Sequence, residues 1–306
     1  MRVAITGATG LIGSRLVSAL GERGDSALVL SRDPDRARER LGGVDAVAWD
    51  PLAGPAPADA LSGADGVVNL AGEPIAQRWG AGVKERIRES RIVGTENLVA
   101  GLEAASPRPA VLVSASGTDV YGDRGDTPLE ESAPPGPPED FLATVCVDWE
   151  RAAAAASELG IRVVCLRTGV VLDRSGGALA KMLPPFRTGI GGPIAGGRQY
   201  VPWIHLDDVV AMYVAALDGG GRSAWSGPVN ACAPEPVTNA AFSRALGRAL
   251  HRPAVMPVPG LALKILYGEM ATVVTSSHRM IPARALELGF EYRYGELDTA
   301  LAAALG

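Results

Sequence analysis

Short runs of β-branched and apolar residues alternate with longer segments of helical periodicity through the first two thirds of the chain. The short runs predict strands at residues 3–6, 27–31, 44–49, 66–70, 110–114 and 161–167. Apolar positions at helical spacing predict helices at residues 11–23, 83–105 and 141–159. Strands separated by helix-length segments favour parallel pairing, in a sheet that helices cover on both faces. The pattern therefore predicts an α/β fold with a doubly wound parallel sheet.

The pattern changes after residue 171. Residues 176–197 are rich in glycine, contain three prolines and interrupt the alternation of strands and helices. Helical patterns return at residues 206–217, 239–250 and 283–288 and at the C-terminus. We therefore expect residues 1–170 to form mainly the sheet domain and residues 171–306 mainly a smaller α/β lobe. Segments near residues 203–218 are expected to return to the sheet domain.

The composition of the 306 residues, with 47% hydrophobic and 21% charged side chains, excludes a disordered chain. The net charge of −5 and the scattered basic residues argue against a nucleic-acid partner, because such binding depends on neutralising phosphates. No apolar stretch reaches the roughly 20 residues that span a bilayer, and no signal sequence opens the chain. We expect a cytoplasmic protein without a membrane partner. The three dispersed cysteines and three dispersed histidines predict neither a disulfide framework nor a metal site.

A glycine-rich turn, TGATGLIG at residues 6–13, joins the first predicted strand to the first predicted helix. Gly7 permits the sharp turn, Gly10 lets the backbone approach a pyrophosphate, and Gly13 lets the helix pack closely on the sheet. The helix N-terminus offers free N–H groups and a positive dipole end to the phosphates. The turn therefore predicts a Rossmann-type dinucleotide site. The residues expected at the cofactor here are Gly7, Thr9, Gly10, Leu11, Ile12 and Gly13.

The end of the second predicted strand indicates which dinucleotide binds. Sites selective for NAD place a carboxylate here to accept a hydrogen bond from the ribose 2′-hydroxyl. This chain has Ser31 and Arg32, and a guanidinium suits a 2′-phosphate because it can donate two charge-assisted hydrogen bonds. We therefore predict NADP(H) as the cofactor. Asp33 is the alternative, since its carboxylate could turn towards the ribose.

A second segment expected at the cofactor is NLAG at residues 69–72, where the fourth predicted strand ends. Small residues at the carboxyl end of a parallel strand leave room for a ribose. Leu70, Ala71 and Gly72 are therefore predicted to contact the cofactor. A glycine that merely ends the strand is the alternative interpretation.

These motifs resemble the extended branch of the short-chain dehydrogenase/reductase superfamily, which includes NAD(P)-dependent sugar-nucleotide epimerases and dehydratases. The closer resemblance is to an atypical "epimerase family" group, and it runs nearly end to end. It rests on NLAGE at residues 69–73, SR at 90–91, GT at 94–95, YGDRG at 121–125, RTGVVL at 167–172, GALAKMLPPF at 177–186 and WIHLDD at 203–208. The resemblance implies a Rossmann domain with a small C-terminal α/β lobe, and it adds Ser114 and Arg167 to the expected cofactor contacts.

The tyrosine and lysine that usually carry the superfamily's chemistry are absent. A Tyr-x-x-x-Lys pair on the helix after the long loop exchanges a proton with the substrate oxygen in the superfamily. Alignment on Glu150 places Leu142 at the tyrosine position and Cys146 at the lysine position. Neither side chain can do that work. The proton must come from Tyr121, Glu73, the substrate or water.

The serine of the superfamily's catalytic set is retained as Ser116, whose hydroxyl can hydrogen-bond a substrate carbonyl. A serine that ties up strand backbone is the alternative. Tyr121 is the phenol nearest to it in sequence, and packing under the long loop is the alternative role for that ring. Between them, Asp119 and Val120 depart from the group's pattern, so any role of the group's residue at position 120 is lost.

Two basic residues are expected on the substrate side. Arg91 stands where many members of the extended branch carry an active-site asparagine, and it lies near the apolar stripe of its helix, so it needs a partner. An anionic substrate group, a cofactor phosphate or an internal carboxylate would serve. Lys181 lies in a glycine-flanked segment and could bind an anion or remain solvated. Glu73 could act as a base beside Gly72 or lie on the surface.

We therefore predict an NADP-dependent oxidoreductase or epimerase that acts on the carbonyl or carbinol group of a small molecule. The alternative is an NADP(H)-binding redox-sensing or scaffold protein with little catalysis, which the missing tyrosine–lysine pair favours. The retained Ser116 speaks against that alternative. The expected partners are a small-molecule substrate and at most one second copy of the chain, as a homodimer.

Overall fold

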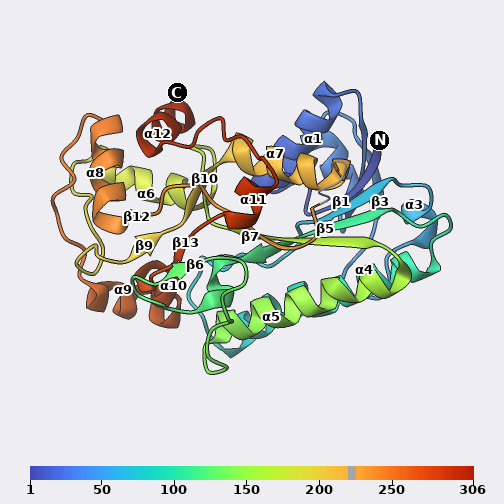
Figure 1. Ribbon diagram of the computed structural model, residues 1–306, viewed down its shortest axis with the longest axis horizontal. Coiled ribbons are helices and arrows are strands. Elements are labelled where there is room, and N and C mark those ends of the chain that lie inside the picture. Colours follow the sequence, from blue (N-terminus) through green and yellow to red (C-terminus); the bar gives the residue numbers. More distant parts are fainter. Residues whose placement is uncertain (220–224) are drawn as a thin grey trace.

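A seven-stranded sheet forms the centre of the protein, shown in Figure 1 as a computed structural model that describes residues 1–219 and 225–306. Its strands are β1 (Arg2–Thr6), β2 (Ser26–Ser31), β3 (Asp45–Ala48), β4 (Gly66–Asn69), β5 (Val111–Gly117), β7 (Arg162–Thr168) and β11 (Gly227–Ala231). They lie in the order β11-β7-β5-β4-β1-β2-β3, with every neighbouring pair parallel. The predicted doubly wound parallel sheet is confirmed. The strand order reverses between β1 and β4, which is where such sheets bind ligands at their carboxyl edge.

Helices cover both faces of the sheet (Figure 1). They are α1 (Leu11–Glu22) and α7 (Leu206–Asp218) on one face, α4 (Ala81–Ala104), α5 (Phe141–Ala154) and its continuation η2 (Ala155–Leu159) on the other, and the short α2 (Pro34–Arg40) and α3 (Ala58–Leu61). Two cores result because successive strand residues point to opposite faces. Val3 and Ile5 lie in the core with α1 and α7, whereas Ala4 lies in the core with α4 and α5. None of the helices in the described part of the chain is long and apolar enough to cross a membrane.

The smaller lobe lies beyond the carboxyl edge of the sheet, on the left of Figure 1. Its elements are β8 (Val170–Leu172), α6 (Gly177–Arg187), β9 (Tyr200–Val201), β10 (Trp203–His205), β12 (Val237–Thr238), α8 (Asn239–Ala249) and α12 (Leu297–Leu305). Phe242, Trp203 and Leu301 centre its separate core. The remaining elements are η1 (Thr118–Tyr121), β6 (Pro128–Leu129), α9 (Gly260–Tyr267), η3 (Gly268–Met270), α10 (Ala271–Thr275), β13 (Arg279–Met280) and α11 (Ala283–Glu287). Strand β13 pairs with β6 of the long loop, so the C-terminal segment reaches the sheet domain.

The chain crosses between the two units more than once. The segment near residues 203–218 divides: β10 pairs with β8 in the lobe, whereas α7 packs on α1 and the sheet. Strand β11 then adds a seventh strand beside β7, which the sequence prediction did not include. A boundary near residue 170 therefore separates the two units only approximately, because residues 206–231 include two elements of the sheet domain.

The glycine- and proline-rich stretch contains a helix that the sequence pattern did not predict. Helix α6 has Pro184 and Pro185 in its interior. Each proline removes one backbone N–H donor from the helix. The helix persists because Leu179, Leu183 and Phe186 bury their side chains in the core of the lobe. Tertiary packing therefore overrides low helix propensity here.

Candidate functional site

The turn between β1 and α1 approaches the end of β4 closely. Gly7 adopts a left-handed conformation, with φ of +68°, and a Cβ there would lie 2.6 Å from the carbonyl carbon of Leu70. A Cβ on Gly13 would lie 2.5 Å from the carbonyl oxygen of Gly7. The backbone N–H of Gly10 donates to that same oxygen at 3.0 Å. Glycine at positions 7 and 13 is therefore required by the protein's own packing.

Gly10 has a different reason to be glycine. A Cβ there would meet only the Gly7 carbonyl oxygen, at 3.3 Å, and the residue is exposed. Gly10 is also the N-cap of α1, and no side chain caps the helix, whose first turn contains no acidic residue. The first N–H groups of α1 therefore lie outside the carboxyl ends of β1 and β4, at the strand switch point, and are suited to bind an anion. This switch-point region is called the crevice below. The partly exposed neighbours Thr9, Leu11, Ile12, Leu70 and Ala71 and the exposed Gly72 surround this opening.

A buried polar network holds the ends of β1 and β4 together. The Thr6 hydroxyl donates to Oδ1 of Asn69 at 2.7 Å and accepts from the backbone N–H groups of Leu70 and Ala71 at 3.1 and 3.2 Å. The Asn69 amide in turn donates to Thr95 and to Ser114, at 2.9 and 3.4 Å. Ser114 is 1% exposed. Ser114 is therefore part of the buried network. Its burial argues against the direct cofactor contact that the sequence predicts for it.

At the end of β2, the carboxylate of Asp33 is already engaged. Asp33 is the N-cap of α2, and its Oδ1 accepts the backbone N–H of Arg36 at 3.0 Å. The Ser31 hydroxyl accepts from the backbone N–H of Asp33 and donates to its carbonyl, which fixes the turn. Arg32 is exposed and makes no side-chain hydrogen bond or ion pair within residues 1–219 and 225–306. A basic side chain rather than an acidic one is therefore free at this position.

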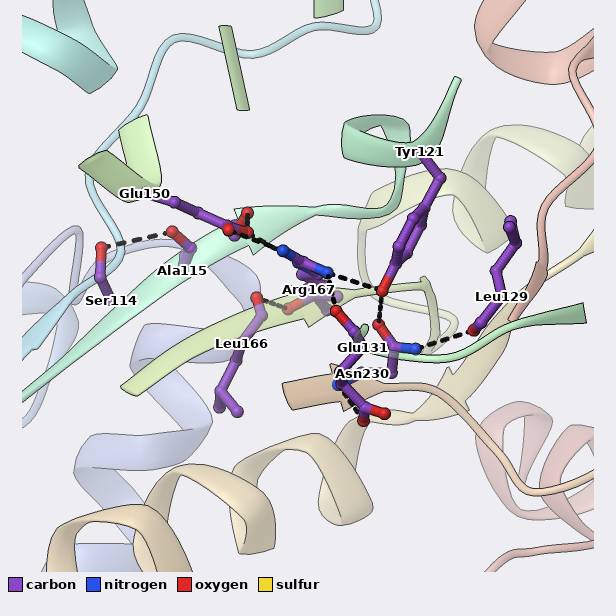
Figure 2. Close-up of polar contacts among 11 residues, drawn as sticks. Ser114, Ala115, Tyr121, Leu129, Glu131, Glu150, Leu166, Arg167 and Asn230 are labelled. Carbon is purple, nitrogen blue, oxygen red and sulfur yellow. Dashed lines mark hydrogen bonds and ion pairs between the residues drawn. The ribbon is translucent and has the colours of Figure 1, made fainter. Parts of the chain in front are cut away.

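A second cluster lies near the carboxyl ends of β5 and β7 and is centred on Arg167 (Figure 2). Its Nε and Nη2 donate to the two carboxylate oxygens of Glu150, each at 2.9 Å. Its Nη1 donates to the Tyr121 hydroxyl at 2.8 Å and to the Glu131 carbonyl at 3.1 Å. The Tyr121 hydroxyl donates to Asn230 of β11 at 2.7 Å. This network joins β7, α5, η1 and β11.

These contacts argue against the catalytic roles that the sequence predicts for Ser116 and Tyr121 and against the cofactor contact that it predicts for Arg167. Ser116 is 5% exposed and donates its only hydroxyl proton to Glu150 at 2.6 Å, so it has none for a substrate carbonyl. Tyr121 is fully buried, and burial raises the pKa of its phenol to about 12. The guanidinium of Arg167 binds internal partners rather than a cofactor. The geometry favours the structural alternatives: strand tethering for Ser116 and packing under the long loop for Tyr121.

Glu73 and Lys181 connect the segment after β4 to its neighbours. Oε1 of Glu73 accepts from Gln77 at 2.9 Å and lies 3.6 Å from Nε of Arg86. Its side chain is 30% exposed, which matches the surface alternative better than a base in the crevice. The ammonium group of Lys181 donates to the carbonyl of Ala76 at 3.0 Å and thereby joins α6 to this segment.

Arg91 of α4 lies against Gly72. A Cβ on Gly72 would lie 3.2 Å from Cζ of Arg91. Nη1 of Arg91 donates to the carbonyls of Glu73 and Ile87, and the guanidinium lies 5.1 Å from the centre of the Trp149 ring. Burial lowers its pKa, and no carboxylate of the described residues pairs with it. The sequence allows an anionic substrate group, a cofactor phosphate or an internal carboxylate as the partner of Arg91. The geometry therefore disfavours the internal carboxylate.

Sequence reasoning overlooked two residues here. Glu150 was used only to align the chain, yet it holds both Arg167 and Ser116. Asp119 was noted only as a departure from the group's pattern, although burial raises the pKa of its carboxyl. The signal that could have drawn attention to Asp119 is the loss of the tyrosine and lysine, since an unexpected acid then stands beside the vacated positions.

A family model described as the NAD dependent epimerase/dehydratase family matches residues 3–230. The chain belongs to this family. A second family model, described only as a domain of unknown function (DUF1731), matches residues 258–304. The first match covers the sheet domain and the first part of the lobe, and the second covers the C-terminal segment. Membership confirms the resemblance to the atypical epimerase-family group.

Relatives in the family match the chain over almost its whole length. The SDR39U1 homologue of Arabidopsis thaliana, named chloroplastic, is 40% identical over 100% of this chain and 87% of its own length. An epimerase family protein of Mycobacterium bovis is 39% identical over 98% of this chain and 96% of its own. Human epimerase family protein SDR39U1 is 35% identical over 98% of each chain.

Solved structures agree with the fold. The crystal structure of human SDR39U1 with NADPH has a TM-score of 0.88 and 34% identity, and the match covers 100% of both chains. A nucleoside-diphosphate sugar epimerase from Corynebacterium glutamicum has a TM-score of 0.76 and 36% identity over all of this chain and 58% of its own. A UDP-N-acetylglucosamine 4-epimerase from Bacillus cereus, at 18% identity and a TM-score of 0.75, shares the fold.

Proposed function

We propose that the protein binds NADP(H) in the crevice between β1 and β4 and acts as an oxidoreductase or epimerase on the carbonyl or carbinol group of a small molecule. The observation that carries this proposal is the uncapped N-terminus of α1, which faces the strand switch point behind an exposed glycine. The human relative crystallised with NADPH supports it. Bound NADPH would supply a hydride to the substrate carbon.

The residues around the crevice fit this cofactor. The N–H groups that follow Gly10 would hold the pyrophosphate, and Leu70, Ala71 and Gly72 would line the ribose on the nicotinamide side. Arg32 and Ser31 would hold the 2′-phosphate, because the carboxylate of Asp33 is occupied as a helix cap. Arg91, desolvated beside Gly72, would bind an anionic or strongly polar group of the substrate. The cytoplasmic location expected from the sequence stays a prediction.

Replacing Arg32 with alanine should weaken NADPH binding by about 10–100-fold, because hydrogen bonds to a charged group contribute about 1.5–3 kcal/mol. NADH lacks the 2′-phosphate, so its affinity should stay within about twofold of wild type. Titration of cofactor fluorescence with both nucleotides measures this. Equal losses for NADPH and NADH would refute the assigned role of Arg32.

Gly10→Ala and Gly21→Ala form a matched pair on α1. A Cβ on Gly21 would have no atom within 4 Å, and a Cβ on Gly10 would meet only one backbone oxygen. Both variants should therefore keep the wild-type melting temperature within a few degrees. Gly10→Ala should weaken NADPH binding by about 10–100-fold, because its methyl group occupies the pyrophosphate position. Unchanged NADPH affinity in Gly10→Ala would place the pyrophosphate elsewhere.

The redox-sensing or scaffold function remains the second candidate, and one observation favours it. Ser116 and Tyr121, the retained parts of the superfamily's usual chemistry, donate their hydroxyl protons to Glu150 and Asn230. A protein of this kind would bind NADPH tightly without consuming it. A panel of aldehydes, ketones and α-dicarbonyls, with NADPH oxidation followed by absorbance, separates the two functions.

A further inference from the structure

A group of apolar side chains between residues 190 and 266 is exposed to solvent. In the described part of the chain, six large apolar side chains are more than half exposed, from 53% for Met256 to 78% for Val255. All six belong to this region, and we call them the apolar patch: Ile190, Val255, Met256, Leu261, Ile265 and Leu266. Single exposed apolar side chains need no explanation, whereas a contiguous group marks an interaction site.

Backbone contacts bring the members of the apolar patch together. The N–H of Met256 donates to the carbonyl of Gly191 at 3.4 Å, next to Ile190. The N–H of Ala195 donates to the carbonyl of Val258 at 2.9 Å, so the two segments run side by side. Helix α9 follows the second segment directly. Figure 1 shows α9 at the left end of the molecule, far from β1 and β3. The apolar patch therefore comes from three neighbouring stretches of chain.

Helix α9, with the sequence GLALKILY, is apolar on more than one side, and none of its residues is buried. Successive residues of a helix are turned by about 100°. Leu261 and Ile265 therefore share one side, whereas Leu266 and Tyr267 lie on two others. A helix that is apolar all round is normally buried. A rigid protein surface would cover one side of α9, whereas the acyl boundary of a lipid layer encloses a helix that sinks into it.

Basic side chains adjoin the apolar patch. Arg244, Arg252 and Val255 are among the residues that line a surface hollow of about 520 Å³ beside α8. Nε of Arg252 donates to the carbonyl of Arg187 at 3.1 Å, which joins the end of α6 to this hollow. Lys264 is exposed on α9 itself. Within residues 1–219 and 225–306, the side chains of Arg187, Arg244 and Lys264 make no hydrogen bond or ion pair.

The unneutralised basic charges indicate what kind of partner covers the apolar patch. The net charge of the chain is −5, so a group of free basic side chains departs from the average of the molecule. A second copy of the chain would bring the same basic side chains against the first, and like charges oppose such a contact. An anionic lipid surface attracts them. Charge and the shape of α9 therefore favour the same partner.

We propose that α9 and the apolar patch dock on an anionic lipid surface, with the apolar side chains in the acyl boundary and the basic ones against lipid phosphates. Eight residues of helix span about 12 Å, so α9 would lie in the interface and not cross the bilayer. Lys264 and Tyr267 suit this depth, because each has an apolar stem or ring and a polar tip. The expectation of no membrane partner rested on the lack of a spanning segment, which such a helix does not need. The inference does not depend on the proposed function.

Co-sedimentation with vesicles tests the lipid surface directly. Wild type should bind vesicles of equal parts phosphatidylcholine and phosphatidylglycerol at least about tenfold more tightly than vesicles of phosphatidylcholine alone. Lys264→Gln should weaken binding to the anionic vesicles by about fivefold, because it removes one basic charge from the interface. Arg40→Gln, at an exposed arginine of α2 in the sheet domain, should change nothing. A wild type that does not bind the anionic vesicles would overturn the proposal.

A double variant tests the role of α9. Leu261→Gln with Ile265→Gln should weaken binding to anionic vesicles by at least about tenfold, because two aliphatic side chains no longer leave water. Both positions are exposed, so the variant should keep the melting temperature and the NADPH affinity of wild type. Leu52→Gln, at a leucine of the sheet domain that is 46% exposed, is the matched control. Unchanged vesicle binding in the double variant would assign the contact to another surface and refute the role of α9.

A fluorescent label tests whether α9 enters the acyl boundary. The three native cysteines are buried, so a thiol reagent labels the new thiol of Leu266→Cys selectively. The emission of an environment-sensitive dye at this position should shift to shorter wavelength when anionic vesicles are added. The same dye on Leu52→Cys should show no shift. Unchanged emission at position 266 in protein that co-sediments with the vesicles would contradict insertion.

Sedimentation equilibrium without lipid distinguishes a second copy from a lipid surface. We expect the oligomeric state of wild type and of the Leu261→Gln, Ile265→Gln variant to be the same. A dimeric wild type and a monomeric double variant would show that a second copy covers α9, and would overturn the lipid proposal. A wild type that binds anionic vesicles but no NADPH would refute the proposed function alone.

Discussion

Replacing Glu150 with glutamine is expected to lower the free energy of unfolding by about 3–5 kcal/mol, the range measured when one partner of a buried ion pair is removed. Glutamine preserves the size of the side chain but leaves the Arg167 guanidinium, with 9% of its side chain exposed, without a counter-charge. Ser116 also loses its charged acceptor. Denaturant titration at neutral pH measures the effect.

An exposed ion pair provides the control for this prediction. Arg248 and Asp298 form a similar contact, at 2.7 Å, with 61% and 66% of their side chains exposed. Asp298→Asn should therefore cost no more than about 1 kcal/mol. A double variant with leucine at positions 150 and 167 should recover much of the free energy of unfolding that Glu150→Gln loses, because it buries no unpaired charge. Equal costs for Glu150→Gln and Asp298→Asn would show that the Arg167 network does not stabilise the fold.

Replacing Gly7 with alanine is expected to damage stability and cofactor binding together. The left-handed backbone costs a non-glycine residue about 1–2 kcal/mol. The new methyl group would also lie 2.6–2.8 Å from backbone atoms of Leu70 and Ala71, and such overpacking costs about 1–3 kcal/mol more. Relief requires β4 to move away from the turn, which opens the crevice. NADPH affinity should therefore fall by at least about tenfold, as measured by fluorescence titration.

Gly24→Ala isolates the backbone contribution. Gly24 has φ of +80° and nothing within 4 Å of its Cβ position, so it carries the backbone cost alone. Its variant should lose about 1–2 kcal/mol and keep wild-type NADPH affinity. If Gly7→Ala were no worse than Gly24→Ala, the close approach of the turn to β4 would have no energetic importance.

The sheet could be predicted because its strands carry their own signal. Runs such as residues 3–5 and 163–166 are apolar on both faces, as is typical of buried parallel strands, and the glycine turn follows the first of them. Strand β11 escaped prediction because it is short and contains Pro228, which an edge strand tolerates. Helix α6 escaped because Pro184 and Pro185 lower local propensity while packing in the lobe core stabilises the helix.

The conformation of the glycine turn could be predicted and the partners of Ser116, Tyr121 and Arg167 could not, for a physical reason. The turn depends on the backbone of consecutive residues, so its requirements are visible in one short segment. The Arg167 network joins residues from positions 116 to 230. Whether a serine hydroxyl donates to a substrate or to Glu150 depends on such distant neighbours, which no local pattern records.

The position of β11 has a consequence for how the protein is made. Strand β7 ends at Thr168, and its outer partner β11 begins only at Gly227, after the first part of the lobe. At about 5–20 residues per second, a ribosome needs about 3–13 s to complete that interval. Throughout it, the nascent chain presents β7 as an unprotected edge that can pair with another chain. A chain whose synthesis ends before β11 is made would therefore keep β7 as a free edge, and we expect such truncated chains to aggregate more readily than the full chain.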